Sequence, residues 1–240
     1  MSQNIEVSAR YTETGNLLQL EYAKKASAKG NTVIGINFRD GVLLAVEKQI
    51  ASKTLDTSSL QSISGISKVY AMTYSGLAHD NNVVVYLMRD FARSVQEQTE
   101  KEPADEMFLD NLRQYLIYFS SYMSYRPVGC EFLVSSGKGG NFSLFYVDPS
   151  GYTCKCYSYS IGCNSQAAKT ELEKIDFSKM SQEDAIQSAV RVFFMSRSPL
   201  VEGPFQIEMM CVSKETCEQT RIPEEEIEKH VSEFSNISIQ

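Results

Sequence analysis

The first amphipathic stretch of the chain carries apolar side chains at helical spacing. Leu18, Tyr22 and Ala26 follow one another at intervals of four residues, and further apolar residues lie beside them. They share one face of a helix that we predict over residues 17–29, and Asn16 is expected to cap its start. Nothing close in the sequence covers this apolar face, so we expect it to contact a neighbouring subunit.

A tight hairpin is predicted directly after this helix. Gly30 is expected to end the helix in the left-handed conformation that glycine adopts at low cost. Residues 33–38 and 42–46 are apolar and rich in β-branched side chains, as strands are. Asp40 and Gly41 lie between them, and this dipeptide favours the positive φ of a two-residue hairpin turn.

Grouped strands and grouped helices follow one another along the rest of the chain. Further strands are predicted over 68–74, 130–135, 142–147, 153–157 and 205–211, and helices over 77–101, from Pro103 onward, over 165–175 and 181–196, and after Pro223. This grouping favours an α+β fold over alternating α/β. The strand 42–46 is apolar on both faces, which indicates a sheet that is covered on both sides. We therefore predict two packed sheets between two helical layers, in one domain.

We place the boundaries of this domain at residues 15–234. Residues 1–14 are polar and lack periodicity, so they are predicted to be an N-terminal tail, and residues 235–240 a C-terminal tail.

Composition narrows the possible functions. The chain has 240 residues, of which 42% are hydrophobic, and a formal net charge of −7. This acidic balance disfavours nucleic acid as a partner, and with it an RNA-associated binding module, because phosphate binding needs a basic surface. No run approaches the ~20 apolar residues of a membrane span, and the first residues lack the apolar core of a secretory signal. We expect a protein of the cytoplasm and nucleus.

Six cysteines offer little support for a metal site. Cys154 and Cys156 are two residues apart in a predicted strand, so their side chains point to one face. Zinc-binding pairs more often have two or more residues between the ligands, and the two histidines of the chain are far away in the sequence. We interpret the cysteines as reduced and mostly buried, and we expect no metal and no cofactor.

Several short motifs of this chain occur together in one protein family. They are Gly15, Gln19, Glu21, Tyr22 and Ala23 in the predicted helix, Ser75-Gly76-Leu77 with Asp80, Arg126-Pro127-Val128-Gly129-Cys130, Asp148-Pro149-Ser150-Gly151, and the segment 166–174. At these spacings, over nearly the whole chain, the sequence resembles the alpha subunits of the eukaryotic 20S proteasome, and the segment 166–174 is especially similar to type-3 subunits at the seventh ring position. The resemblance implies a four-layer αββα sandwich, the N-terminal-nucleophile hydrolase fold, with an extra N-terminal helix.

The catalytic residues of that fold are replaced in this chain. Its catalytic members, such as proteasome beta subunits, use an N-terminal threonine whose free amine acts as base, together with a lysine and an aspartate. Alignment places Asn31 at the nucleophile, Glu47 at the aspartate and Ser62 at the lysine. Thr32 is one residue out of register and lies behind the predicted helix. We therefore expect a non-catalytic subunit; a self-processing peptidase or amidohydrolase of the same fold is the alternative.

The resemblance also implies partners. Seven alpha subunits form a ring that stacks on a ring of beta subunits, in a particle of twenty-eight subunits that degrades ubiquitin-tagged proteins. The N-terminal tails close the axial pore, and the ATP-dependent regulatory particle or other activators dock on the alpha ring. The predicted helix, with Leu18, Gln19 and Tyr22, is then a ring contact. In many relatives a proline, a tyrosine and an aspartate at fixed positions of the tail help to open the gate. Here Asn4-Ile5 and Tyr11-Thr12-Glu13-Thr14 stand at these positions instead, whereas Tyr22 is kept.

Pockets between alpha subunits receive the C-terminal tails of activators. The family positions that line such a pocket correspond here to Glu21, Gly76, Leu77 and Ser62. In relatives the fourth position is a lysine that pairs with the carboxylate of the tail. Serine donates only a neutral hydrogen bond, so we expect this pocket to hold a tail weakly or to stay empty, and Ser62→Lys to tighten binding.

Overall fold

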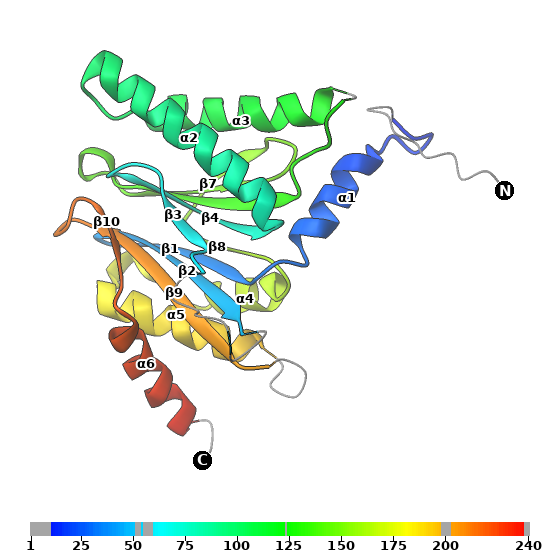
Figure 1. Cartoon of the computed structure of the whole chain (residues 1–240). Helices are drawn as coiled ribbons and strands as arrows, with labels where there is room; N and C mark the ends of the chain where they lie inside the picture. The colour runs from blue at the N-terminus through cyan, green and yellow to red at the C-terminus, as the bar shows by residue number, and fades with distance from the viewer. Residues whose placement is uncertain (1–10, 51–53, 55–59, 123, 198–202, 238–240) are drawn as a thin grey trace.

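Two five-stranded antiparallel sheets lie face to face at the centre of the protein (Figure 1). A computed structural model describes residues 11–50, 54, 60–122, 124–197 and 203–237. The first sheet has the order β10 (Gln219–Arg221), β9 (Phe205–Ser213), β2 (Gly41–Gln49), β1 (Val33–Phe38) and β8 (Ser158–Ile161). The second has the order β3 (Ile63–Gly65), β4 (Tyr70–Gly76), β5 (Cys130–Ser136), β6 (Ser143–Val147) and β7 (Thr153–Cys156).

Helices cover the outer face of each sheet. The helices are α1 (Leu18–Ser27), α2 (Ala78–Thr99), α3 (Asp105–Ser121), α4 (Ser165–Leu172), α5 (Gln182–Ser196) and α6 (Glu224–Ile237), with short 3₁₀ turns η2 (Lys138–Gly140) and η3 (Phe177–Lys179). Figure 1 shows α2 and α3 over the second sheet, and α4, α5 and α6 on the side of the first. The predicted α+β sandwich of four layers, with an extra N-terminal helix, is confirmed.

Three apolar clusters hold the layers together. The first fills the space between the two sheets and includes Val33, Leu44 and Leu133. The second lies between the second sheet and helices α2 and α3, where the rings of Tyr70 and Phe108 stack at 4.3 Å. The third lies between the first sheet and helices α4, α5 and α6. The predicted burial of β2 on both faces is observed at every position except the last.

The structure contains three short strands that the periodicity did not reveal. β3 and β10 have only three residues each, too few to show alternation. The third is β8: the strand predicted over 153–157 ends at Cys156, and the chain then crosses to the other sheet, where residues 158–161 pair with β1. None of the described helices is both long and apolar enough to cross a membrane.

Two local predictions, the conformation of a hairpin turn and the cap of a helix, were wrong. The hairpin pairs Phe38 with Gly41 around a two-residue turn, but neither Asp40 nor Gly41 has a positive φ. Gly41 is required for space, because a Cβ there would lie 2.3 Å from the Val212 carbonyl oxygen. Asn16 does not cap α1 either; the N-cap position is Leu17, without a side-chain hydrogen bond.

Two element ends also differ from those predicted. α3 begins at Asp105, after the N-cap Ala104, so Pro103 precedes the helix instead of lying in its first turn. α6 continues to Ile237, past the boundary drawn at residue 234. Residues 1–10 of the predicted N-terminal tail and residues 238–240 of the C-terminal tail lie outside the part of the chain that the structure describes.

Candidate functional site

Helix α1 lies at one end of the sandwich, apart from the two helical layers (Figure 1). One face of its C-terminal half is buried, with Ala23 7% and Ser27 0% exposed, whereas Tyr22 is 51% exposed. The ammonium group of Lys24 lies 2.8 Å from the Asp148 carboxylate, in the family motif after β6. The apolar stripe is therefore only partly covered by this chain's own sheet.

The end of α1 is held against the turn between β4 and α2. The Ser75 hydroxyl donates to the carbonyl oxygens of Ser27 and Asn31, both at 2.9 Å. Gly30 approaches the backbone of Gly76 so closely that a Cβ at Gly30 would lie 2.1 Å from the Gly76 nitrogen. Gly30 does not have a positive φ, so its predicted role as a left-handed helix end was wrong. Its role is to let the two backbone segments meet.

This contact forms one wall of a cavity of about 380 Å³. The cavity is lined by Tyr22, Lys25, Ala26, Lys29, Gly30, Gly76 and Leu77. Gly76 has φ +127°, and a Cβ there would lie 2.1 Å from the Gly129 carbonyl oxygen, so only glycine fits this wall. Lys25 and Lys29 are both exposed, which makes the open side of the cavity positively charged.

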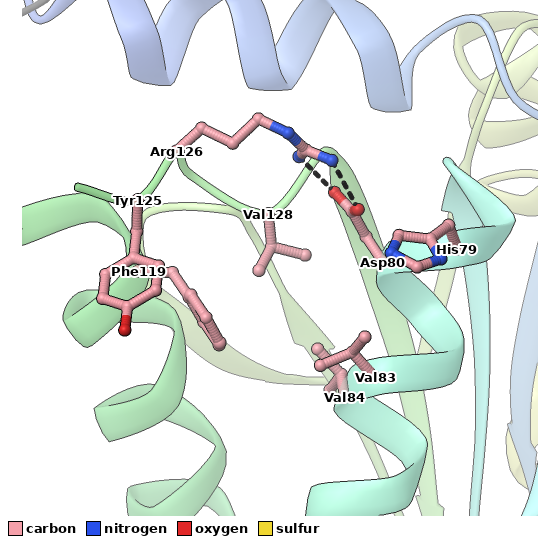
Figure 2. A pocket seen from close by; sticks show the side chains of 8 residues that line it. All are labelled: His79, Asp80, Val83, Val84, Phe119, Tyr125, Arg126 and Val128. Atoms are coloured by element: carbon pink, nitrogen blue, oxygen red, sulfur yellow. Dashed lines mark hydrogen bonds and ion pairs between the residues drawn. The ribbon is translucent and has the colours of Figure 1, made fainter.

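Asp80, which belongs to the same motif as Gly76 and Leu77, is held by an ion pair with Arg126. Arg126 donates to both carboxylate oxygens of Asp80, at 2.5 and 2.7 Å (Figure 2). The amide of Gly129 also donates to Asp80, at 2.9 Å. Burial alone would raise the pKa of Asp80, but the hydrogen bonds from Arg126 and Gly129 outweigh it and hold that pKa below its usual value. Two motifs that are far apart in the sequence therefore form one unit at the start of α2.

The predicted site residues are only partly brought together. Gly76, Leu77 and Tyr22 line the cavity, whereas Glu21 and Ser62 are not among its lining residues. Leu18 and Gln19 are half-buried on the first turn of α1. Lys25 and Lys29 were not predicted as site residues, although a signal was present in the sequence: both follow Tyr22 at helical intervals on the same face.

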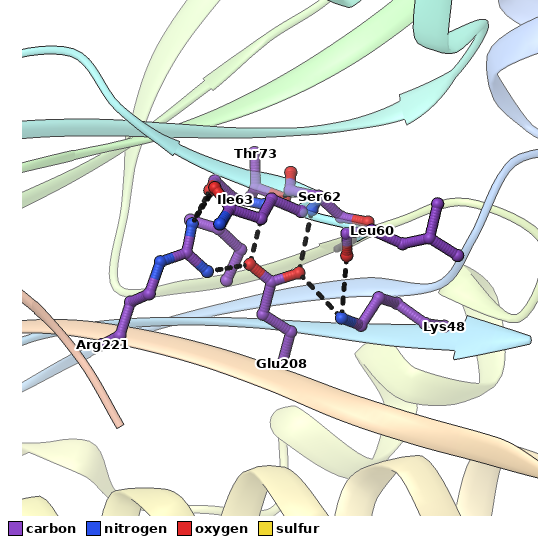
Figure 3. Close-up of polar contacts among 8 residues, drawn as sticks. Lys48, Leu60, Ser62, Ile63, Thr73, Glu208 and Arg221 are labelled. Carbon is purple, nitrogen blue, oxygen red and sulfur yellow. Dashed lines mark hydrogen bonds and ion pairs between the residues drawn. The ribbon is translucent and has the colours of Figure 1, made fainter. Parts of the chain in front are cut away.

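Ser62 belongs to a different, buried polar network between the two sheets (Figure 3). It is 8% exposed, and its amide donates to the Glu208 carboxylate at 2.8 Å. The same carboxylate pairs with Lys48 at 3.4 Å and with Arg221. This network fastens β3 to β9 of the other sheet and gives the start of β3 a structural role.

The three catalytic positions of the fold do not form an active site here. Asn31 is an internal residue behind α1, and its carbonyl oxygen accepts the hydrogen bond from Ser75. Thr32 is 1% exposed and its hydroxyl lies 3.4 Å from the Cys163 sulfur. Glu47 is 2% exposed and pairs with Arg197 at 2.9 Å. A nucleophile with a free amine is absent from the position of Asn31. The nearby Thr32 hydroxyl is buried against Cys163, and the Glu47 carboxylate is paired with Arg197.

Comparison with known proteins agrees with this geometry. The family model described as "Proteasome subunit" matches residues 27–212. A protein of Encephalitozoon cuniculi, named "Probable proteasome subunit alpha type-7", is 31% identical over 98% of both chains. "Proteasome subunit alpha type-3" of Acanthamoeba castellanii is 29% identical over 87% of this chain and 83% of its own. The protein of the same name from Arabidopsis thaliana is 28% identical over 91% of this chain and 88% of its own.

The chain therefore belongs to the proteasome subunit family. The relatives named above are alpha subunits of type 3 and type 7, and like them this chain is a non-catalytic alpha-type subunit that assembles with other proteasome subunits into rings. The alternative of a self-processing hydrolase is not supported.

Proposed function

We propose that this subunit serves ring assembly, pore gating and activator docking in a 20S core particle that carries out ubiquitin-dependent protein degradation in the cytoplasm and nucleus. The observation that carries the docking role is the cavity beside α1, where Tyr22, Gly76 and Leu77 meet two exposed lysines. Its partners in this role are neighbouring alpha and beta subunits and the ATP-dependent regulatory particle or another activator.

The charge of the cavity supports a peptide carboxylate as its ligand. Because Ser62 is buried in the Glu208 network, its hydroxyl is poorly placed to meet a tail that enters from solvent. Lys25 and Lys29 lie on the open side of the cavity and carry flexible ammonium groups. We assign recognition of the carboxylate to these two lysines, with Leu77 and Tyr22 as the apolar wall.

The assembly role is supported by the exposed part of α1. Tyr22 remains half exposed and Leu18 half buried in the single chain, so apolar area is available to a neighbour in a ring. Glu21 lies beside them on the helix and is a further candidate for this contact. The gating role is assigned to the tail that precedes α1, of which residues 11–14 are described: Thr12 and Asn16 form a hydrogen-bonded turn there.

The docking proposal is tested with a photo-crosslinking peptide that carries an activator C-terminus. Assembled particles are labelled, and the fraction of this chain that is cross-linked is read by mass, which separates this cavity from those of other subunits. We expect Lys25→Gln and Lys29→Gln each to lower the affinity roughly two- to fivefold, the range of an exposed charge pair. Amidation of the peptide terminus should remove the difference between the variants and the native chain.

Two further variants complete the experiment. Lys179→Gln removes an exposed lysine of η3, outside the cavity, and should leave labelling unchanged. Ser62→Lys tests the sequence-based hypothesis: tighter binding that amidation abolishes would assign the carboxylate to position 62. Equal labelling by the free and the amidated peptide in every variant, in particles shown to be intact, would contradict carboxylate docking at this subunit.

A further inference from the structure

Two thiols of strand β7 are in contact with each other. Cys154 and Cys156 lie on the same face of the strand, and their Sγ atoms are 3.6 Å apart. Both are free and half-buried, so neither is sealed inside the core. Cys156 also packs against the apolar cluster between the two sheets, without being fully buried.

The two sulfur atoms are close together, but the strand is more extended than a disulfide allows. A disulfide brings the sulfurs to about 2.05 Å, so closure needs an approach of about 1.5 Å, which side-chain rotation provides in part. Cα atoms two residues apart in a strand are separated by roughly 6.6–6.8 Å, from the rise per residue. That separation is at the upper end of the range of about 4.4–6.8 Å observed in disulfides. The two Cβ atoms leave the same face of the strand and are about as far apart as the Cα atoms, whereas a disulfide needs about 3.5–4.5 Å between them. Closure therefore requires the backbone between the two cysteines to bend out of the extended conformation.

Strand β7 lies at the edge of its sheet, where a change in backbone conformation breaks few hydrogen bonds. It is the last strand of its sheet, and its described ladder pairs Cys154 with Tyr146 and Cys156 with Leu144 of β6. Its other edge has no strand beside it in this sheet order. Directly after Cys156 the chain leaves the sheet and crosses to β8 in the other one. An edge strand that ends at Cys156 has few hydrogen bonds to lose on bending.

We propose that Cys154 and Cys156 form a reversible dithiol–disulfide pair, a modification site whose co-reactant is a low-molecular-weight disulfide of the glutathione type. Cys154 attacks one sulfur of that disulfide, forms a mixed disulfide and releases one small thiol. Cys156 then attacks the Cys154 sulfur and releases the second small thiol. Two protein thiols are oxidised to one disulfide, the small disulfide is reduced to two thiols, and the two thiol protons end on the released molecules.

The order of attack follows from the surroundings of the two sulfurs. Burial, together with the adjoining Cys154, raises the pKa of Cys156 to about 12, which disfavours its thiolate while both cysteines are reduced. The mixed disulfide on Cys154 removes the contribution of that thiol to the raised pKa, which favours attack by Cys156 in the second step. We therefore assign the first attack to Cys154 and the resolving step to Cys156. A metal is the weaker interpretation, because the described residues contain no group of three or more histidine, cysteine or acidic side chains that could hold one.

The chain offers a direct readout, because Lys155 lies between the two cysteines. Trypsin cleaves after this lysine, so Cys154 and Cys156 fall into the separate peptides 139–155 and 156–169. These peptides stay joined in a non-reduced digest only if a disulfide connects them. Assembled particles are incubated with glutathione disulfide, the remaining thiols are blocked, and the digest is analysed before and after reduction.

We expect the joined peptides after oxidation, in a subunit that has lost the mass of two hydrogen atoms, and separate peptides after reduction. Cys163 shares the second peptide, so Cys163→Ser is included and should still give the joined species. Cys156→Ser should stop at a stable glutathione adduct on Cys154, and Cys154→Ser should leave Cys156 unmodified. Two unmodified thiols in the native chain, or a lasting adduct on Cys154 like that of Cys156→Ser, would overturn the proposal.

Discussion

Gly30 and Gly76 meet backbone to backbone, and this contact joins the end of α1 to the turn before α2. A Cβ added at Gly30 would lie 2.1 Å from the Gly76 nitrogen and 2.5 Å from the Ser75 hydroxyl oxygen. Both atoms belong to a turn that is itself held by hydrogen bonds, so they have little freedom to move away. The position of α1, and with it the shape of the cavity, depends on the absence of a side chain at residue 30.

Gly30→Ala is therefore predicted to destabilise the subunit by about 1 to 3 kcal/mol, the usual cost of overpacking a tight contact. Denaturant unfolding followed by circular dichroism measures this change. Gly65→Ala is the matched control, because a Cβ there has no atom within 4 Å. If Gly30→Ala unfolds at the same denaturant concentration as Gly65→Ala, the backbone contact does not position α1.

Asp80→Asn is predicted to cost about 1 to 3 kcal/mol at pH 7, because Arg126 and the Gly129 amide lose a buried charged acceptor. The pKa of Asp80 is lowered in the folded state, so its contribution is present above the unfolded pKa and is lost as the pH falls through the folded pKa. The difference between wild type and Asp80→Asn should thus be full at neutral pH and shrink below about pH 4, near the unfolded value.

Urea unfolding of both proteins across this pH range gives the measurement. Asp110→Asn is a suitable control, because its pair with Arg113 is exposed to solvent. That surface pair is expected to contribute less than about 1 kcal/mol. A pH-independent difference for Asp80→Asn would mean that the ionised carboxylate is not what stabilises the start of α2.

Leu18→Asp and Tyr22→Asp should impair entry into the ring. Each places a charge where apolar area is expected to be buried by a neighbour, at a cost of roughly 1 to 3 kcal/mol. The amount of each variant in assembled particles, relative to the amount synthesised, measures the effect. Unfolding of the free chain separates an interface effect from a folding defect. Full incorporation of both variants would remove α1 from the assembly interface.

The isolated subunit is predicted to hydrolyse no fluorogenic peptide. Asn31 occupies the place of the nucleophile, and Thr32 is buried behind an intact α1. The assay compares the purified chain with the variant Thr32→Ala. Turnover that copurifies with the native chain and disappears in the variant would contradict a non-catalytic role.

The sequence predicted the layers well because their signals are local and long. The strands 33–38 and 42–46 and the helix beginning near Leu77 carry enough apolar positions to show their period, and the structure contains them as β1, β2 and α2. β3 and β10 were missed because three residues carry no period, and they exist through pairing with longer strands. The crossover from β7 to β8 was missed because no glycine, proline or other turn residue marks it between Cys156 and Ser158.

The site was less predictable, since it depends on contacts between distant segments. Tyr22 and Leu77 were assigned from family motifs, and they line the cavity. The same reasoning grouped Ser62 with them, but its environment is set by Glu208, a residue 146 positions away. No sequence pattern near Ser62 or Glu208 predicts that contact. Lys25 and Lys29 were within reach of a helical-face argument that was applied only to apolar residues.

A native mass spectrum of the particle purified through a tag on this chain shows whether the chain is a ring subunit. We expect this subunit in a full core particle, at one copy in each alpha ring, together with other alpha and beta subunits. We also expect the residues before Thr32 to be retained in the intact mass of the released subunit. A chain that purifies alone or only with copies of itself, or one that has been cut so that Thr32 is its first residue, would contradict this expectation.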